Sequence, residues 1–187
     1  MKNLLVAVPQ LEVHRPPVST ALLAGIMHGE GHQVSCIDLN IQMYNDWGER
    51  EYYSYVDVWE KTREPTEEEI HNIRNFIVEH LLPHCDVNTR VLISVFTGNS
   101  QLFTKHSCEL ILQYYPDCEI VLGGMGCTKG FGSYMLETSL CSHVVYGEGE
   151  QALLNLLKGN TDYPGIDNES TQIQVSDLNT KSFPDYS

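Results

Sequence analysis

Three glycine-containing turns constrain the fold of this chain more than any other feature of its sequence. They occupy residues 94–100, 123–126 and 147–150, and each follows a short β-branched run, at 91–93, 120–122 and 143–146. A segment with helical spacing comes after each turn. The repeated order of strand, glycine turn and helix is typical of an α/β sheet that binds a ligand at the carboxyl ends of its strands. Glycine suits such a turn because no Cβ keeps a ligand away from the backbone.

The remaining pattern predicts two more strands and four helices around these turns. The strands are expected at 4–8, 33–39, 90–96, 119–122 and 142–146, and helices at 19–29, 66–81, 101–114 and 148–157, with a short, weak one near 134–140. Thr66 followed by three glutamates is a strong helix start, since the acids favour the positive end of the helix dipole. Beyond residue 160, the alternating segment 171–175 indicates an edge strand or half of a hairpin.

These elements predict an α/β, flavodoxin-like (Rossmann-like), doubly wound and mainly parallel sheet of five strands. The strand order 2-1-3-4-5 is favoured over 3-2-1-4-5, because the first turn, at 9–19, contains no glycine. A dinucleotide-binding first turn would need G-x-G-x-x-G. Residues 1–159 are expected to form one domain, and residues 160–187 a tail or linker.

Residues 40–65 form an acidic segment rich in tyrosine and tryptophan, and no clean period runs through it. The sequence predicts an insertion between two elements of the sheet. Two interpretations stay open. The segment is a long ordered loop with a function, or it is a surface excursion whose aromatic side chains pack on the neighbouring helix.

The charge balance excludes several classes of partner. Lys and Arg total 11 against 25 Asp and Glu, which gives a formal net charge of −14. Duplex nucleic acid and anionic membrane surfaces are not expected partners, because both require a basic face. The apolar run at 4–8 is too short for a signal peptide or a membrane span, so a cytoplasmic location is expected. No two of the six cysteines have metal-finger spacing, and Cys36 and Cys108 are expected to be small buried hydrophobic residues.

Five segments, in their order and spacing, resemble a known family. They are Pro16-Pro17, residues 31–34 leading to 38–40, residues 94–96, residues 121–124 and residues 146–150. Together they are similar to the N-terminal cobalamin (B12)-binding domain of B12-dependent radical SAM proteins. The resemblance covers residues 1–160. Residues 183–186 also resemble the segment that leads into the radical SAM barrel of that family.

The resemblance implies that cobalamin lies on the carboxyl edge of the sheet, with its dimethylbenzimidazole tail in a slot between small residues. The matching cofactor-binding positions are Ser94, Val95, Phe96, Thr97, Gly98, Gly123, Gly124, Met125, Gly147, Glu148 and Gly149. Small residues suit the wall of a slot for a flat heterocycle, and a serine hydroxyl can hydrogen-bond a ring nitrogen. Alternatively, Ser94 caps the next helix, for which Ser100 is the better candidate, and Gly123-Gly124 is only a tight turn.

His14 is the candidate metal ligand. Related methyltransferases and mutases carry D-x-H-x-x-G in the first loop, where the histidine binds cobalt from below. Here Glu12 and His14 keep that spacing, but Pro17 replaces the final glycine. A carboxylate behind an imidazole is a sensible support for a metal ligand. The alternative is an ordinary solvated loop histidine.

The chain has no C-x-x-x-C-x-x-C, so it lacks the family's motif for an iron–sulfur cluster. The resemblance therefore implies a module that is not catalytic alone, with the cluster and S-adenosylmethionine held by a radical SAM domain in cis or in trans. Methyl transfer is the expected reaction, and the 44–59 aromatics are expected to face the partner or the corrin.

Two alternative functions stay open. In the first, Phe96 and Met125 narrow the slot, and the domain binds proteins or recruits substrate without cofactor. In the second, the chain is a flavin binder or a stand-alone enzyme. The first loop at 9–13 offers no phosphate-binding residues, and no spacing supports a pairing of Cys127 with His143 or His106.

Overall fold

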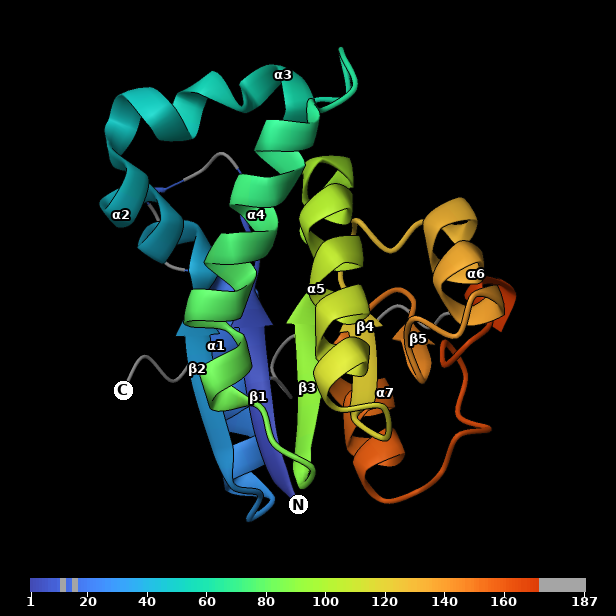
Figure 1. The fold of residues 1–187 in the computed structure, drawn as a ribbon. Helices are drawn as coiled ribbons and strands as arrows, with labels where there is room; N and C mark the ends of the chain where they lie inside the picture. The colour runs from blue at the N-terminus through green and yellow to red at the C-terminus, as the bar shows by residue number, and fades with distance from the viewer. Residues whose placement is uncertain (11–12, 15–16, 172–187) are drawn as a thin grey trace.

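The computed structural model describes residues 1–10, 13–14 and 17–171, and their strands form one parallel sheet (Figure 1). The strands are β1 (Lys2–Ala7), β2 (Val34–Asp38), β3 (Thr89–Ser94), β4 (Glu119–Gly123) and β5 (His143–Val145). Their order is β2-β1-β3-β4-β5, with every neighbouring pair parallel. The predicted fold class and strand order are confirmed. The chain adds β2 on one side of β1 and then adds β3, β4 and β5 on the other side. The boundary between β1 and β3 is therefore the topological switch point of the fold.

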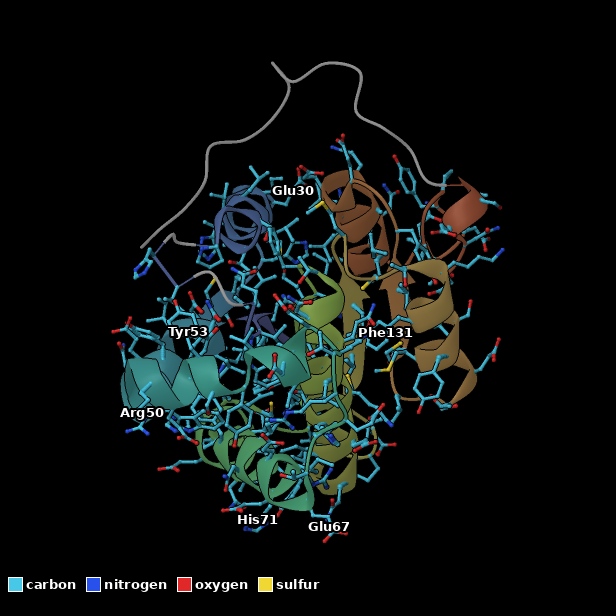
Figure 2. All side chains as sticks on the ribbon, turned by 90° about the horizontal axis from the view of Figure 1, so that it is seen from above. Glu30, Arg50, Tyr53, Glu67, His71 and Phe131 are labelled. Atoms are coloured by element: carbon cyan, nitrogen blue, oxygen red, sulfur yellow. The ribbon has the colours of Figure 1, made fainter. Side chains whose placement is uncertain are left out.

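Helices cover both faces of the sheet, but unequally (Figure 2). The helices are α1 (Val18–Gly29), α2 (Leu39–Ser54), α3 (Val56–Trp59), α4 (Glu67–His80), α5 (Gln101–Tyr114), α6 (Lys129–Glu137) and α7 (Gly149–Leu157), with short 3-10 turns at Leu82–His84, Gly98–Ser100 and Glu169–Thr171. Within the described residues, α1 and α7 lie on one face, and the helices between β2 and β5 lie on the other. Among the residues that the structure describes, two helices therefore cover one face of the five strands.

Side chains that alternate between the two faces of each strand divide the hydrophobic core into two clusters. Leu4, Val6 and Ile93 belong to the larger cluster, under α2 to α6. Leu5 and Leu92, their neighbours in sequence, belong to the smaller cluster under α1 and α7. Successive side chains of a strand point to opposite faces, so near-continuous apolar strands are what a sheet buried on both faces requires.

Helix α4 starts and packs as its sequence predicts. The Thr66 hydroxyl accepts a hydrogen bond from the Glu69 backbone N–H, and the Glu69 carboxylate accepts one from the Thr66 N–H. This capping box satisfies two donors that the helix leaves unpaired. Ile73, Phe76 and Ile77 form the buried face, and burying each stabilises the fold by roughly 1.5–3 kcal/mol.

The segment 40–65 is helical, which corrects the prediction of a loop-like insertion. Helices α2 and α3 form its main part. Asp38 is the N-cap of α2, and its carboxylate accepts from the backbone N–H groups of Asn40 and Ile41. Gly48 interrupts α2 with a φ of 76°. The alternative that the aromatics pack on the neighbouring helix is confirmed, since the Trp47 ring lies 5.9 Å from that of Phe76 on α4.

Three smaller predictions are wrong. Cys36 is exposed, because β2 is the outermost strand and its central side chains lie beyond the helical cover. The weak helix expected at 134–140 is present as α6, but its bounds are wrong, because the helix spans Lys129–Glu137. Ser100 does not cap α5 with its side chain; its hydroxyl donates instead to the carbonyl of Pro9 at 3.0 Å and joins the first loop to the third.

The residues after α7 pack along the free edge of β5. Ile166 forms an antiparallel bridge with Val145 and is 5% exposed. The strand or hairpin predicted at 171–175 lies, except for its first residue, outside the described residues. None of the helices in the described part of the chain has the length and apolar character needed to cross a membrane.

Candidate functional site

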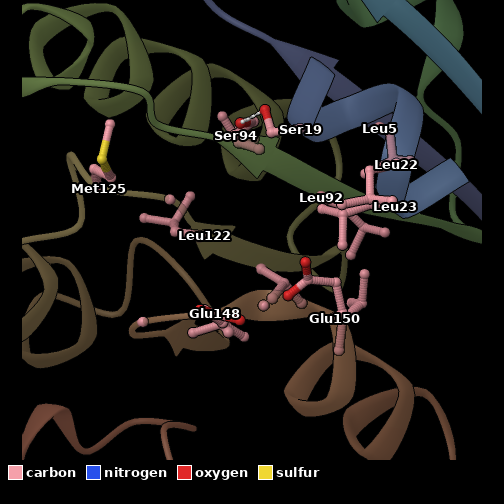
Figure 3. Close-up of a pocket in the computed structure, with 18 residues that line it drawn as sticks. Leu5, Ser19, Leu22, Leu23, Leu92, Ser94, Leu122, Met125, Glu148 and Glu150 are labelled. Carbon is pink, nitrogen blue, oxygen red and sulfur yellow. Dashed lines mark hydrogen bonds between the residues drawn. The ribbon is translucent and has the colours of Figure 1, made fainter. Parts of the chain in front are cut away.

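A cavity of about 210 Å³ lies at the carboxyl end of the sheet, on the face covered by α1 and α7 (Figure 3). Its walls are mainly apolar. Leu5, Leu92 and Val121 come from the strands, Leu22 and Leu23 from α1, and Leu153 from α7. We refer to this cavity as the slot. An apolar cavity with few polar groups is the usual form of a small-molecule or cofactor site.

The strand register explains why the sheet side of the slot is open. Ala7, Ser94 and Gly123 are register partners across β1, β3 and β4. They lie two residues after Leu5, Leu92 and Val121, so they are on the same face of the sheet. In this last row, small residues on β1, β3 and β4 therefore follow the bulky residues of the row below. The next member of the row, Val145 on β5, is bulky and forms a side wall of the slot. Space remains above the three small residues because their own side chains do not fill it.

The two helices provide the other walls. Their C-terminal ends are joined by the Lys158 ammonium, which lies 3.0 Å from the Glu30 carboxylate. Their N-terminal turns instead contribute Ser19 and Leu22 on one side, and Gly149 and Glu150 on the other, to the lining of the slot. The slot thus lies between the starting turns of α1 and α7, over β3 and β4.

Polar groups occur only at a few points of the lining. The hydroxyls of Ser19 and Ser94 lie 3.2 Å apart in a hydrogen bond, with either atom able to donate. Glu148 and Glu150 bring carboxylates to the lining from the N-terminus of α7. A hydroxyl both donates and accepts, so the serine pair can bond a ring nitrogen of a flat heterocycle whose faces contact leucine and valine.

Gly123 and Gly124 are adjacent at the β4 turn, but the structural requirement for glycine differs between the two positions. Gly124 has a φ of +104°, and a Cβ there would stand 2.5 Å from the carbonyl oxygen of Val95. Gly126 donates to that same oxygen at 2.8 Å. The turn packs so closely on the end of β3 that Gly124 is required by the fold. A Cβ on Gly123 would meet only Val145, at an ordinary 3.7 Å, so the fold alone does not require glycine there.

Seven of the eleven predicted cofactor-binding residues line the slot. They are Ser94, Gly123, Gly124, Met125, Gly147, Glu148 and Gly149. The other four do not. Val95 is buried in the opposite core, Phe96 is 41% exposed, and Thr97 and Gly98 continue the loop towards α5. The Thr97 hydroxyl oxygen is buried without a hydrogen-bond partner among the described residues.

Sequence reasoning missed several lining residues. Ser19, Leu22, Leu23 and Leu153 were assigned to helix starts or to the core, and Glu150 only to a turn. The signal that would find them is the strand order. In the order 2-1-3-4-5 the first and last helices share one face, and their first turns lie beside the carboxyl ends of β3 and β4.

His14 does not line the slot. Its side chain is exposed, and its ring lies 6.5 Å from that of Tyr44, edge to face. No group of three or more His, Cys, Asp or Glu residues in the described part of the chain is arranged to hold a metal ion.

The candidate cysteine–histidine pairs do not form a nucleophilic site. Burial raises the pKa of the Cys127 thiol to about 12, which disfavours the thiolate that attack would need. His143 Nδ1 lies 2.7 Å from the Asp167 carboxylate, and His106 Nδ1 lies 3.1 Å from that of Glu109. Each imidazole is thus engaged with a carboxylate rather than with Cys127.

Comparison with known proteins gives a likeness of fold. No family model and no curated protein matches the chain. Among solved structures, it is similar to TsrM from Kitasatospora setae, a radical S-adenosylmethionine methyltransferase with cobalamin and a 4Fe–4S cluster bound, at 19% identity and a TM-score of 0.52. The match covers 89% of this chain and 29% of TsrM. A second TsrM structure, with tryptophan substrate and a SAM analogue bound, gives 17% identity, a TM-score of 0.49, and coverage of 89% and 28%. The chain thus spans less than a third of the length of the enzyme that it resembles.

Proposed function

We propose that this chain is a cobalamin-binding module, which holds B12 at the carboxyl edge of the sheet for a radical SAM domain in cis or in trans. The dimethylbenzimidazole base of the cofactor would enter the slot, and the corrin would lie over the turns that follow β3, β4 and β5. When bound, cobalamin supplies a cobalt centre able to carry a methyl group. Methyl transfer is accordingly the proposed reaction of the complete enzyme.

The slot is the observation that carries this proposal. It lies where the glycine turns meet, and its walls suit a flat aromatic base: leucine and valine for the ring faces, and Ser94 with Ser19 for a ring nitrogen. Gly123 supports the fit further, because a side chain there would project into the slot although the surrounding fold has room for its Cβ. The residues present therefore suit the base of the cofactor.

The carboxyl edge also suits a large group placed above the slot. Phe96 and Met125, on the turns after β3 and β4, are 41% and 75% exposed. Exposed apolar side chains beside a ligand cavity offer contact area to a bound ligand or to a neighbouring domain. The likeness to one part of TsrM is in keeping with a partner domain that holds the iron–sulfur cluster and S-adenosylmethionine. His14, on the loop after β1, would be the residue that binds cobalt.

The test is retention of corrin absorbance after incubation with hydroxocobalamin and removal of unbound cofactor. The chain is expected to retain it. Gly123→Leu should fill the slot and abolish retention while leaving the circular dichroism spectrum unchanged. Gly130→Leu is the matched control, because Gly130 is exposed on α6 with nothing within 4 Å of its Cβ position.

Other outcomes contradict parts of the proposal. A folded chain that retains no corrin, even with a radical SAM partner domain added, would favour the alternative of a cofactor-free interaction module. Equal retention by Gly123→Leu would place the cofactor elsewhere. His14→Ala should alter the visible spectrum of the bound corrin if the imidazole contacts cobalt, and an unchanged spectrum would remove His14 from the site.

A further inference from the structure

A second cavity, of about 230 Å³, lies among α5, α6 and the loop between α3 and α4. Three basic residues line it: Lys61, Arg63 and Lys105. The whole chain has only 11 Lys and Arg and a net charge of −14, so a cavity with three of them is a local exception. Gln101, also on its wall, donates to the carbonyl of Gly126 at 2.7 Å. The cavity therefore lies behind the β4 turn, away from the slot.

In the part of the chain that the structure describes, two of the three cations are not hydrogen-bonded to a carboxylate. Arg63 is neutralised, since its guanidinium makes two hydrogen bonds to the Glu69 carboxylate. Lys61 instead donates to the neutral amide oxygen of Gln101 at 2.5 Å. Lys105 lies 3.9 Å from the nearest oxygen of Glu109, a long ion pair. Even with the carboxylate of Glu64 on the wall, the balance of the cavity is positive.

The backbone at Lys61 is unusual for a residue with a side chain. Its φ is +57°, directly after the C-cap of α3. Glycine, or less often asparagine, is the usual residue at that position, because a Cβ is disfavoured there. A lysine held in this conformation suggests that its side chain serves a purpose other than ending the helix.

The wall beside the two ammonium groups is aromatic. The Lys105 Nζ lies 5.6 Å from the centroid of the Tyr134 ring, in a cation–π arrangement. Phe131, one turn earlier on α6, also lines the cavity, and Tyr134 is 41% exposed. A ligand bound here would meet positive charge and ring surface together.

We propose that this cavity is a binding site for an anionic group, either a phosphate or a carboxylate, carried on a flat ring. The anion would lie between the ammonium groups of Lys61 and Lys105, which suits both kinds of anion by charge. The ring would lie against Phe131 and Tyr134. The site is separate from the slot, so it does not depend on cobalamin binding.

Phenyl phosphate and benzoate are the test ligands, because they share the ring and differ in the anion. Each is titrated into the full chain at constant ionic strength, and backbone amide shifts are followed by NMR. We expect saturable shifts at the amides of Lys61, Gln101, Lys105 and Tyr134. The ligand with the lower Kd identifies the anion class. Absence of saturable shifts there with both ligands would overturn the proposal.

Lys61→Gly and Lys105→Gln are the decisive variants. Each removes one exposed charge contact, so together they should raise the Kd of the tighter ligand roughly tenfold. Lys61→Gly should also leave the melting temperature unchanged or raised, which separates lost binding from lost folding. Lys158→Gln is the control, because Lys158 pairs with Glu30 on the opposite face. An unchanged Kd in the double variant, or an equal loss in Lys158→Gln, would refute the site. Corrin retention should be unchanged in all three.

Discussion

Replacing the adjacent glycines of the β4 turn by alanine should change the stability of the fold in opposite directions. At Gly123 the new methyl group meets Val145 at 3.7–3.8 Å, which is ordinary contact. Where the native backbone accepts alanine without strain, the substitution stabilises by about 0.4–1 kcal/mol, because the unfolded chain loses conformational freedom. Gly123→Ala should therefore make the chain slightly more stable.

At Gly124 the same substitution should be strongly destabilising. The φ of +104° strains any residue with a Cβ, at a cost of about 1–3 kcal/mol. The methyl group would also stand 2.5 Å from the Val95 carbonyl oxygen, a backbone atom that can retreat only if β3 shifts. That shift disturbs the hydrogen bond from Gly126 N–H to the same oxygen, which is worth about 0.5–1.5 kcal/mol. The total loss is about 2–4 kcal/mol.

Urea unfolding followed by circular dichroism measures both variants against the parent chain. With the two effects opposed, the free energies of unfolding of the two variants should differ by about 2–5 kcal/mol. For a domain of 187 residues this corresponds to a gap of roughly 10 °C in melting temperature. Corrin retention should be weakened in Gly123→Ala although the protein is more stable. Equal destabilisation by both substitutions would refute the assignment of Gly123 to the ligand and Gly124 to the fold.

Two further predictions concern charge and thiol chemistry. The Arg63 guanidinium lowers the pKa of Glu69 to about 2, below the ordinary 4.5, so this pair stabilises the fold above pH 4.5, and the benefit is lost as the pH falls towards 2. Glu69→Gln can keep the capping box, and it should lower the free energy of unfolding by about 1 kcal/mol at pH 7. A difference in urea midpoint between the variant and the parent chain that persists at pH 2 would contradict this. For the thiols, Cys36 is exposed and the other five cysteines are buried. A thiol reagent at pH 8 should label one group per native chain quickly, and the fast phase should vanish in Cys36→Ser; a fast phase that survives would refute the burial of the others.

The strands and the glycine turns could be predicted from the sequence because their causes are local. A run such as 91–93 is apolar on both faces, which is characteristic of a strand covered by helices on both sides. Thr66 and the three glutamates after it mark the start of α4 within four residues, and the structure confirms a helix start there, with a capping box. Features that depend on a few neighbouring residues are visible in the sequence.

The helices of segment 40–65 were missed for an equally physical reason. Gly48, with a φ of 76° and a ψ of 162°, interrupts α2 and resets the helical period there. Helix α3 has four residues, too few to show a period of its own. Aromatic side chains such as Tyr52 of α2 and Trp59 of α3 are buried, at 0% and 1% exposure, so tyrosine and tryptophan take core positions that aliphatic residues more often mark in a helical pattern. Asp38 as N-cap was the available local signal.

The slot shows where local reasoning ends. Leu22, Leu23 and Leu153 occupy apolar helix positions. The sequence does not distinguish a leucine that packs in the core from a leucine that borders a cavity. Whether the space stays open depends on two non-local facts. The strand register aligns Ser94 with Gly123 in the last row of the sheet, and two helices cover that face where five strands lie beneath them. The strand order decides which strands are neighbours and which helices share a face. A known strand order would therefore have indicated the position of the slot, which the local sequence does not. The identity of its occupant, in contrast, rests on the chemistry of the few polar groups at its mouth.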